Sequence, residues 1–437
     1  MSADVDTTAS RAGQESARRI PASRYTSREW EDLENERLWT RVWQIACTED
    51  CVPNAGDFWE YEIGPISVFV LRDEDGALRA FKNVCPHRGT SLIRGSGCGL
   101  AEVQCPYHHW RFDLKGHFRG TDDSDVPLGR SGATSLTPVA VDTWGGFVFV
   151  NPDPDCEPLG AFLESLPDEL AWVGMADFGC SDFLTLAVPC NWKVVVDAFI
   201  ETYHLHAVHP QMLAIADDVH TPITLYDKHS MFMQPYGVPS PRRNGTVSDQ
   251  ELWDEFIRNL GHRLGLTFAS IEDPGPAPSV PEGQTLRDVL VSKIRAHLAT
   301  LTSRYETLDD NHVIDDFHYH VFPNSVFNVF AGWYGLIRAR PGPTPHESYI
   351  DMWNFDLRPA DAPDRHPRPR VNVLDPDDLS SLGTVLPQDI DVLTRAQKGL
   401  RQASESVLRL VPAEARIGRM HEILDRYIDP PPDRRLP

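Results

Sequence analysis

The sequence Cys85-Pro86-His87-Arg88-Gly89, followed by Cys105-Pro106-Tyr107-His108, decides the fold of the first third of the chain. Each motif offers one thiolate and one imidazole, in a loop bounded by Pro and Gly between short apolar runs. A cluster of two irons and two sulfides takes four protein ligands, and two imidazoles on one iron raise its reduction potential. The pattern Cys-x-His with Cys-x-x-His is typical of such a cluster, which we expect two hairpin tips to hold between them.

Zinc is the alternative for the same four residues, because a tetrahedral site of two Cys and two His is chemically acceptable. Zinc fingers usually pair Cys with Cys and His with His, whereas each motif here mixes the two. The iron–sulfur interpretation is therefore favoured. His109 lies one residue beyond the ligand spacing and Cys98 matches no ligand position, so neither is expected to be a ligand.

The composition narrows the class of protein. A chain of 437 residues can form two or three domains, each with its own core. The net charge of 41 − 64 = −23, with neutral histidines, argues against nucleic acid or an anionic membrane as a partner. Eight scattered cysteines fit reduced thiols, and no apolar run suits a signal peptide or a membrane span. We therefore expect a soluble, cytoplasmic protein.

The sequence predicts a disordered N-terminus at 1–25, followed by a β-rich domain at 26–155. The motif Thr26-Ser27-Arg28-Glu29 resembles a capping box and predicts a helix that extends to Trp43. Strands are then predicted at 58–63, 66–71, 78–81, 102–104, 110–112, 139–141 and 147–150. Many short strands at this spacing favour an antiparallel β-sandwich.

The pattern then changes to α+β, which predicts a second domain at 156–437. A strand is predicted at 183–188, and a helix from Asn191 to about Ala207. An antiparallel meander is predicted at 317–322, 326–331, 333–340 and 347–357, with final helices at 387–409 and 412–427. Two helical patterns within 245–305 indicate that residues 213–310 form an insertion or lid.

The predicted helix after Asn191 carries candidate metal ligands. Glu201 and His204 are three residues apart and would share a helix face, while Pro210 would end or bend the helix beside His209. Two imidazoles and one carboxylate, with open positions left over, form the facial triad that binds non-haem Fe(II) for oxygen activation. A histidine-rich helix alone is weak support, because surface or core histidines give the same pattern.

The two regions together resemble the large (alpha) subunits of Rieske non-haem iron oxygenases, which include aromatic-ring-hydroxylating dioxygenases. The likeness rests on the two cysteine–histidine motifs, on Asn191-Trp192-Lys193, and on the pattern Glu-x-Tyr-His-x₄-His that begins at Glu201. These motifs follow in the family's order, and the likeness extends from about residue 35 to 425. It implies a Rieske β-sandwich domain and a catalytic domain of helix-grip type, whose antiparallel sheet is flanked by helices.

The resemblance also implies residue roles. The ligands of the [2Fe-2S] cluster would be Cys85, His87, Cys105 and His108. His204 and His209 would bind the mononuclear Fe(II), with Asp389 as the third ligand. Asp391 is the alternative, and either Asp could instead be a charge at a helix start. Glu201 would be the catalytic carboxylate that links the two metal centres across a subunit boundary, reaching His108 of the next chain.

The implied activity is oxidation by O₂, with electrons from NAD(P)H delivered by a separate ferredoxin or flavin reductase, because the chain has no convincing dinucleotide fingerprint. We expect mono- or dihydroxylation of an apolar, aromatic or alicyclic substrate by a homotrimer, with or without small β subunits. Glu201 stands where ring dihydroxylases often carry Asp, so oxidative N- or O-demethylation or quaternary-amine oxidation is an alternative. A non-catalytic Rieske electron-transfer protein is the alternative from another class. Apolar residues expected around the pocket are Phe199, Leu205, Val208, Leu213, Phe327, Phe330 and Trp333.

Overall fold

The computed structural model describes residues 19–122, 135–266, 268, 270–358, 368–403 and 405–429. The chain divides into two compact units. The smaller unit comprises Leu33–Ala176 and Pro363–Arg370, and the larger unit comprises Met1–Asp32, Asp177–Ala362 and Val371–Pro437. Most of the disorder expected for 1–25 falls outside the described residues. Residues 19–25, however, form β1 (Arg19–Pro21), paired with β20 (Val407–Arg409), and the 3₁₀ turn η1 (Ala22–Tyr25).

The smaller unit is built on antiparallel strands, as the sequence predicts. Its main sheet has the order β2-β11-β10-β5-β4-β3-β6, and a three-stranded sheet has the order β7-β8-β9. The strands are β2 (Gln44–Thr48), β3 (Phe58–Ile63), β4 (Ile66–Arg72), β5 (Leu78–Lys82), β6 (Ser96–Gly97), β7 (Val103–Gln104), β8 (Arg111–Phe112), β9 (Phe118–Gly120), β10 (Pro138–Trp144) and β11 (Phe147–Asn151). The helical segments are η3 (Glu49–Cys51), α2 (Leu159–Leu163) and α3 (Leu166–Glu169).

The first helix is shorter than the sequence predicts. Helix α1 (Arg28–Leu33) begins where the Trp30 N–H donates to the Ser27 hydroxyl at 3.2 Å, so Ser27 rather than Thr26 caps it. A π-helical turn, η2 (Glu34–Leu38), then ends the helical segment before Trp43. The predicted end is wrong because the buried apolar side chains after Leu38 belong to a turn and to the approach to β2.

The larger unit contains an eight-stranded sheet of order β13-β14-β15-β16-β17-β18-β12-β19. The predicted meander is confirmed, because β15, β16, β17 and β18 pair antiparallel in sequence order. The strands are β12 (Phe178–Val188), β13 (Ile223–Leu225), β14 (Ser230–Gln234), β15 (Asp316–Val321), β16 (Ser325–Phe330), β17 (Trp333–Pro341), β18 (Ser348–Leu357) and β19 (Asn372–Val373).

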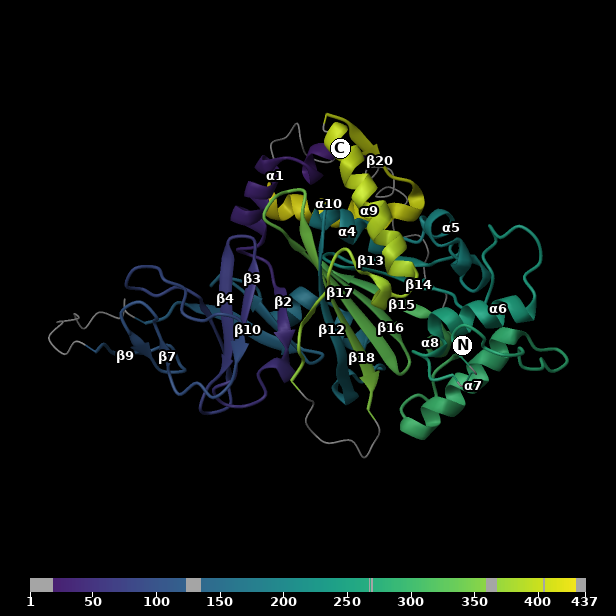
Figure 1. Ribbon diagram of the computed structural model, residues 1–437, viewed down its shortest axis with the longest axis horizontal. Helices are drawn as coiled ribbons and strands as arrows, with labels where there is room; N and C mark the ends of the chain where they lie inside the picture. The colour runs from purple at the N-terminus through teal and green to yellow at the C-terminus, as the bar shows by residue number, and fades with distance from the viewer. Residues whose placement is uncertain are drawn as a thin grey trace. The chain divides into compact units, whose positions relative to one another are not determined.

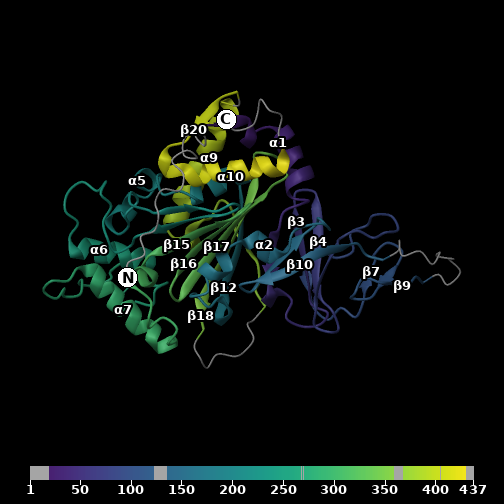
Figure 2. The ribbon, with the colours of Figure 1, turned by 180° about the vertical axis from the view of Figure 1, so that it is seen from behind.

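Helices gather in two groups around this sheet. In Figure 1, α4, α9 and α10 lie together, while α6, α7 and α8 form a separate group, and Figure 2 again shows α9 with α10 and α6 with α7. The helices are α4 (Trp192–Phe199), α5 (Leu205–Val208), α6 (Asp249–Phe256), α7 (Leu286–Leu301), α8 (Asp310–Ile314), α9 (Val385–Gln402) and α10 (Ala415–Ile428). Shorter turns are η5 (Met175–Asp177), η6 (Pro210–Ala214), the π-helical η7 (Ile257–Gly261), η8 (Ser380–Leu382) and η9 (Pro412–Glu414). Within the described residues, no helix has the length and apolar character needed to cross a membrane.

One face of the sheet is covered by α4 and α10, and we call it the site face. His318 of β15 marks it: Arg416 of α10 packs against its ring nitrogen Nδ1 at 3.1 Å, and the backbone of Phe199 at the end of α4 hydrogen-bonds the same ring. Because successive side chains of a strand alternate between faces, the register places Asn328 and Gly335 on the site face beside His318.

Candidate metal centre

The segment that carries the histidines is two helices rather than the single helix predicted from Asn191 to Ala207. Helix α4 is capped by the Asn191 side chain, which accepts the Lys193 N–H at 3.1 Å, and it ends at Phe199. A non-helical link then leads to α5, which begins after His204. The link forms because the Glu201 carboxylate accepts the backbone N–H of His204 at 3.0 Å, replacing a helical carbonyl as acceptor.

Glu201 also fixes the ring of His204. Its second carboxylate oxygen lies 2.6 Å from Nδ1 of His204. A carboxylate can only accept here, so Nδ1 carries the proton and Nε2 carries the lone pair. Glu201 is nearly buried, with a side chain 8% exposed, whereas the His204 side chain is 22% exposed. The sequence singled out this pair correctly, although the two residues meet across a turn and not along a helix.

The carboxylate of the site comes from α9. Asp389, Leu393 and Gln397 are buried and lie four residues apart, so they form the inner face of this helix. Gln397 ties α9 to the start of α4, because its side-chain oxygen accepts the Asn191 N–H at 2.9 Å. Asp391 lies on the outer face, where its exposed side chain pairs with Arg395.

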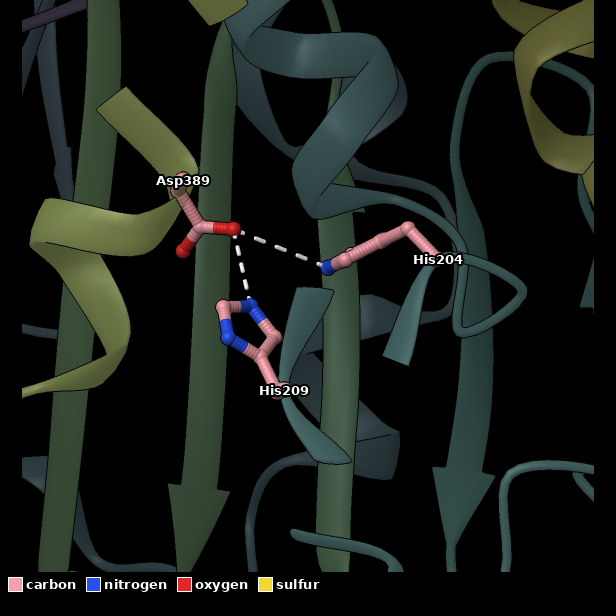
Figure 3. A group of neighbouring side chains, drawn as sticks. All are labelled: His204, His209 and Asp389. Atoms are coloured by element: carbon pink, nitrogen blue, oxygen red, sulfur yellow. Dashed lines mark hydrogen bonds and ion pairs between the residues drawn. The ribbon is translucent and has the colours of Figure 1, made fainter. Parts of the chain in front are cut away.

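The structure brings His204, His209 and Asp389 together. A carboxylate oxygen of Asp389 lies 2.9 Å from Nε2 of His209 and 3.7 Å from Nε2 of His204. One ligand atom from each residue lies within 4.8 Å of the others. Figure 3 shows the three side chains pointing toward a common point from α9 and from the segment around α5. The two imidazole rings are almost perpendicular, at 76°.

Gln388 is a residue of this site that sequence reasoning missed. Its side-chain oxygen lies 2.8 Å from Nδ1 of His209 and accepts a second hydrogen bond from Gln211, also at 2.8 Å. An amide oxygen is an acceptor, so Nδ1 of His209 donates and Nε2 again faces Asp389. Its position directly before Asp389 at a helix start was the only signal in the sequence.

These contacts place two imidazole lone pairs beside a carboxylate, an arrangement that a cation between them would stabilise. Burial alone lowers the pKa of His204, but the hydrogen bond and charge of Glu201, together with Asp389, raise it overall. Ligand atoms about 2.1 Å from one metal ion and at right angles lie roughly 3 Å apart, which the 2.9 Å between Asp389 and His209 matches. Two imidazoles and one carboxylate are also the donor set of non-haem Fe(II), so these residues fit that ion.

The two cysteine–histidine loops of the smaller unit have matching backbones. In the first loop the Cys85 N–H donates to Thr90 and the Gly89 N–H donates back to Cys85, at 2.8 and 2.9 Å. In the second loop the Cys105 N–H donates to the Trp110 carbonyl at 2.8 Å, and the His109 N–H donates back to the Cys105 carbonyl at 3.0 Å. The fourth residue after each Cys has a left-handed backbone, with φ of +79° at Gly89 and +55° at His109.

The match gives His109 a position in the turn of the second loop. His109 fills the turn position that Gly89 fills in the other loop, and its Nδ1 lies 2.6 Å from a carboxylate oxygen of Asp122. Cys98, which matches no ligand position in the sequence, is an exposed thiol elsewhere in the unit.

The four side chains separate into a buried sulfur pair and an exposed imidazole pair. Cys85 and Cys105 are each 1% exposed, and burial raises the pKa of the Cys85 thiol, with Cys105 close enough to raise it further. The rings of His87 and His108 lie 4.8 Å apart at the surface, and His87 stacks on Trp110. Within the described residues, only His204, His209 and Asp389 converge closely enough for a single ion. A two-iron core spanning a sulfur pair and an imidazole pair therefore fits these loops better than one zinc ion.

Two family models match the chain. The Rieske [2Fe-2S] domain matches residues 42–128, and the ring hydroxylating alpha subunit (catalytic domain) matches residues 171–430, more than half of the chain. The chain belongs to the ring-hydroxylating alpha-subunit family. A Rieske [2Fe-2S] cluster and a mononuclear iron are the cofactors of such chains, and each matched region contains a set of side chains that fits one of them.

The matches to curated relatives include only part of this chain and part of each relative. The carnitine monooxygenase oxygenase subunit of Escherichia coli K12 is 32% identical over 231 residues, 51% of this chain and 59% of the relative. The glycine betaine monooxygenase oxygenase subunit of Chromohalobacter salexigens is 33% identical over 184 residues, 41% of each chain. The chain thus spans about half the length of the curated relatives it matches.

Solved structures show the same fold over nearly the whole chain. The quaternary ammonium Rieske monooxygenase CntA, crystallised with L-carnitine, has a TM-score of 0.67 at 19% identity, covering 95% of this chain and 96% of that one. Naphthalene 1,2-dioxygenase from Rhodococcus, crystallised with indole, has a TM-score of 0.64 at 19% identity and covers 94% of each chain. The predicted α+β fold, with a Rieske β domain before a helix-flanked catalytic sheet, is confirmed.

Proposed function

We propose that this protein is a Rieske-type oxygenase that oxidises a small organic substrate with O₂ at an iron held by His204, His209 and Asp389. The observation that supports it most strongly is the convergence of these three residues within 4.8 Å, in a chain that also carries the paired cysteine–histidine loops. The iron, when bound, supplies the one-electron chemistry that lets triplet O₂ react with a closed-shell molecule.

The surrounding side chains keep the site in shape. Glu201 and Gln388 each hold the Nδ1 proton of one imidazole, which leaves both Nε2 atoms free to bind metal. His209 and Asp389 are almost fully buried, while the His204 side chain is 22% exposed, so the centre is accessible from the side of His204. That is the side on which we place O₂ and substrate.

We further propose that Cys85, His87, Cys105 and His108 hold the [2Fe-2S] cluster that delivers electrons to this iron. A separate ferredoxin or flavin reductase would supply the electrons from NAD(P)H. Glu201 would be the carboxylate that couples the two centres, contacting His108 of a neighbouring chain in a homotrimer with or without β subunits. None of the eight cysteines, all of which lie within the described residues, forms a disulfide bond, and this supports a reducing, cytoplasmic location.

We propose one of two substrate classes. Hydroxylation of an apolar aromatic or alicyclic compound follows from the family as a whole. Oxidation of a quaternary amine, or a related N- or O-demethylation, is favoured by the carnitine and glycine betaine relatives and by Glu201, which stands where ring dihydroxylases often carry Asp. A purely electron-transferring Rieske protein would have no use for the three-residue centre formed by the two residues that flank α5 and by Asp389 of α9.

Iron analysis of the paired variants Asp389→Ala and Asp391→Ala tests this proposal. The wild type should hold about three irons and two sulfides per chain after anaerobic reconstitution, one of the irons in the mononuclear site. Asp389→Ala should fall to about two irons and lose substrate-dependent O₂ uptake, whereas Asp391→Ala should match the wild type. A wild type with only two irons would identify an electron-transfer protein instead, and an iron loss confined to Asp391→Ala would move the third ligand there.

A further inference from the structure

The N-terminal segment, by which we mean residues 19–27, is packed among the last elements of the chain. Its strand β1 pairs with β20, and the Ala22 N–H donates to the Ser406 carbonyl at 2.9 Å. Arg24 and Tyr25 of this segment are each 1% exposed. The N-terminal segment therefore belongs to the larger unit, although the smaller unit follows it in the sequence.

Tyr25 connects this segment to three helices. Its hydroxyl lies 2.6 Å from a carboxylate oxygen of Asp197 on α4 and 2.9 Å from Nε2 of His421 on α10. Its backbone carbonyl accepts a hydrogen bond from the side-chain amide of Gln397 on α9, at 3.1 Å. Its ring packs edge-on against the ring of His421, with the centroids 5.5 Å apart. One buried residue thus contacts α4, α9 and α10, the helices that lie together in Figure 1.

The hydrogen bonds around Tyr25 have a fixed direction. Burial lowers the pKa of His421, so its ring is neutral near pH 7. The Arg24 guanidinium can only donate, so Nδ1 of His421, 3.3 Å away, is the acceptor and the ring proton is on Nε2. Nε2 therefore donates to the Tyr25 oxygen, which leaves the Tyr25 proton for Asp197. Burial and the Asp197 charge raise the pKa of Tyr25 well above its ordinary value, so the hydroxyl keeps that proton.

The Asp197 carboxylate depends on this hydroxyl. Within the described residues, Tyr25 is its single hydrogen-bond donor. The other carboxylate oxygen is buried without a hydrogen-bond partner, and Nε2 of His421 lies 3.6 Å from it. A largely buried carboxylate that loses its donor is costly, and α4 relieves that cost by shifting to hydrate it. The position of α4 is therefore tied to Tyr25.

Helices α4 and α9 lead to opposite sides of the metal centre. Asp197 lies two residues before the end of α4, and the link that follows leads directly to His204. Gln397 lies on the same inner face of α9 as Asp389, about 12 Å along the helix. The distance of 3.7 Å between Asp389 and Nε2 of His204 therefore depends on the spacing of the two helices, which Tyr25 contacts on both sides.

We propose that Tyr25 is a positioning residue for the mononuclear iron. Through Asp197 and Gln397 it fixes the spacing between the histidine segment and the carboxylate of Asp389. This role rests on the proposed function, since that function requires the iron. A side chain outside the ligand set acts in this way because metal affinity depends on how closely the free protein already holds the bound geometry. The sequence prediction placed residue 25 in a disordered N-terminus, so it missed this role.

Fe(II) binding by the reconstituted full chain, measured by competition with a chelator under anaerobic conditions, tests the proposal. Tyr25→Phe removes the hydroxyl but keeps the ring and the carbonyl. It should bind iron about tenfold more weakly, which corresponds to about 1.4 kcal/mol. Asp197→Ala should lose as much, and the double variant no more, because both changes remove one hydrogen bond. Asp197→Asn keeps an acceptor for Tyr25 and should retain most of the affinity.

A spectroscopic signature provides the second readout. Nitric oxide bound to the mononuclear Fe(II) gives a paramagnetic resonance signal whose shape reports the ligand geometry, while the oxidised cluster is silent. This signal should broaden or shift in Tyr25→Phe and keep its wild-type shape in Asp197→Asn. Tyr305→Phe is the matched control, because Tyr305 is buried in the same unit and its hydroxyl bonds the backbone of Gly332. It should match the wild type in both measurements.

The outcomes separate this proposal from the proposed function. Wild-type affinity and signal in Tyr25→Phe, or losses that simply add in the double variant, overturn the positioning role and leave the oxygenase function in place. If Tyr25→Phe fails to fold, equal iron affinity of Asp197→Asn and Asp197→Ala overturns it instead. A wild type that binds no mononuclear iron rejects the proposed function and the positioning role together.

Discussion

Replacing Gln388 by Leu should weaken iron binding without removing any ligand. The Gln388 oxygen accepts hydrogen bonds from His209 Nδ1 and Gln211, both at 2.8 Å. The His209 side chain is 3% exposed, so a Leu at position 388 would leave its Nδ1 proton buried without an acceptor. Such a loss costs about 1–3 kcal/mol. The metal-free protein can avoid this cost if the His209 ring turns away or if its proton moves to Nε2, but the metal-bound protein cannot. Iron binding should therefore weaken by roughly 10- to 100-fold.

The assay is competition for Fe(II) between the protein and a chelator of known affinity, under anaerobic conditions. The visible spectrum of the cluster should be unchanged, since the Rieske loops belong to the other unit. Gln402→Leu, at an exposed position on the same helix, is the control and should bind iron like the wild type. Wild-type iron affinity in Gln388→Leu would refute the view that this amide orients His209, and loss of the cluster spectrum would indicate general unfolding instead.

Three further predictions concern single residues. His204→Ala should abolish substrate-dependent O₂ uptake yet keep the cluster's absorption and paramagnetic resonance, and losing both together would count against two separate sites. Glu201→Gln keeps an acceptor for His204 but removes the negative charge, so cluster reoxidation in a single turnover should slow while both metals stay bound; an unchanged rate would reject the coupling role. Burial raises the pKa of Asp316 from its ordinary value to about 8, so the folded state holds a proton that the unfolded chain loses between about pH 4 and 8. Stability of the wild type should therefore fall as pH rises through that window, by up to about 1.4 kcal/mol per pH unit, and thermal melts of Asp316→Asn should show a flatter profile.

Much of the fold was predictable because its signals are local. The alternation of β15 to β18 is a period of two residues, and the strands lie within one or two residues of their predicted limits. The cysteine–histidine loops were predictable for the same reason, since ligand type and spacing are set within a few residues. These features depend on neighbours in sequence, so sequence alone contains them.

The metal centre shows where such reasoning stops. A helix through 191–207 was a sound prediction from apolar spacing, but the Glu201 carboxylate takes the backbone N–H of His204 and interrupts it. The choice between Asp389 and Asp391 depends on which face of α9 is buried, and that face is set by Gln397 and its contact with the start of α4. Contacts between distant segments decide both points, and periodicity does not report them.

The donors of the metal centre are far apart in sequence, and this has a consequence for the whole larger unit. His209 and Asp389 are 180 residues apart, and between them run the insertion and most of the strands of the sheet. An ion bound by both residues cross-links the two ends of this 180-residue segment, much as a covalent bond would. It stabilises only the folded state, because the unfolded chain does not bring the two residues together. Cellular iron supply would then govern how long the protein survives proteolysis, because chains that never acquire the ion would open more often and be degraded first.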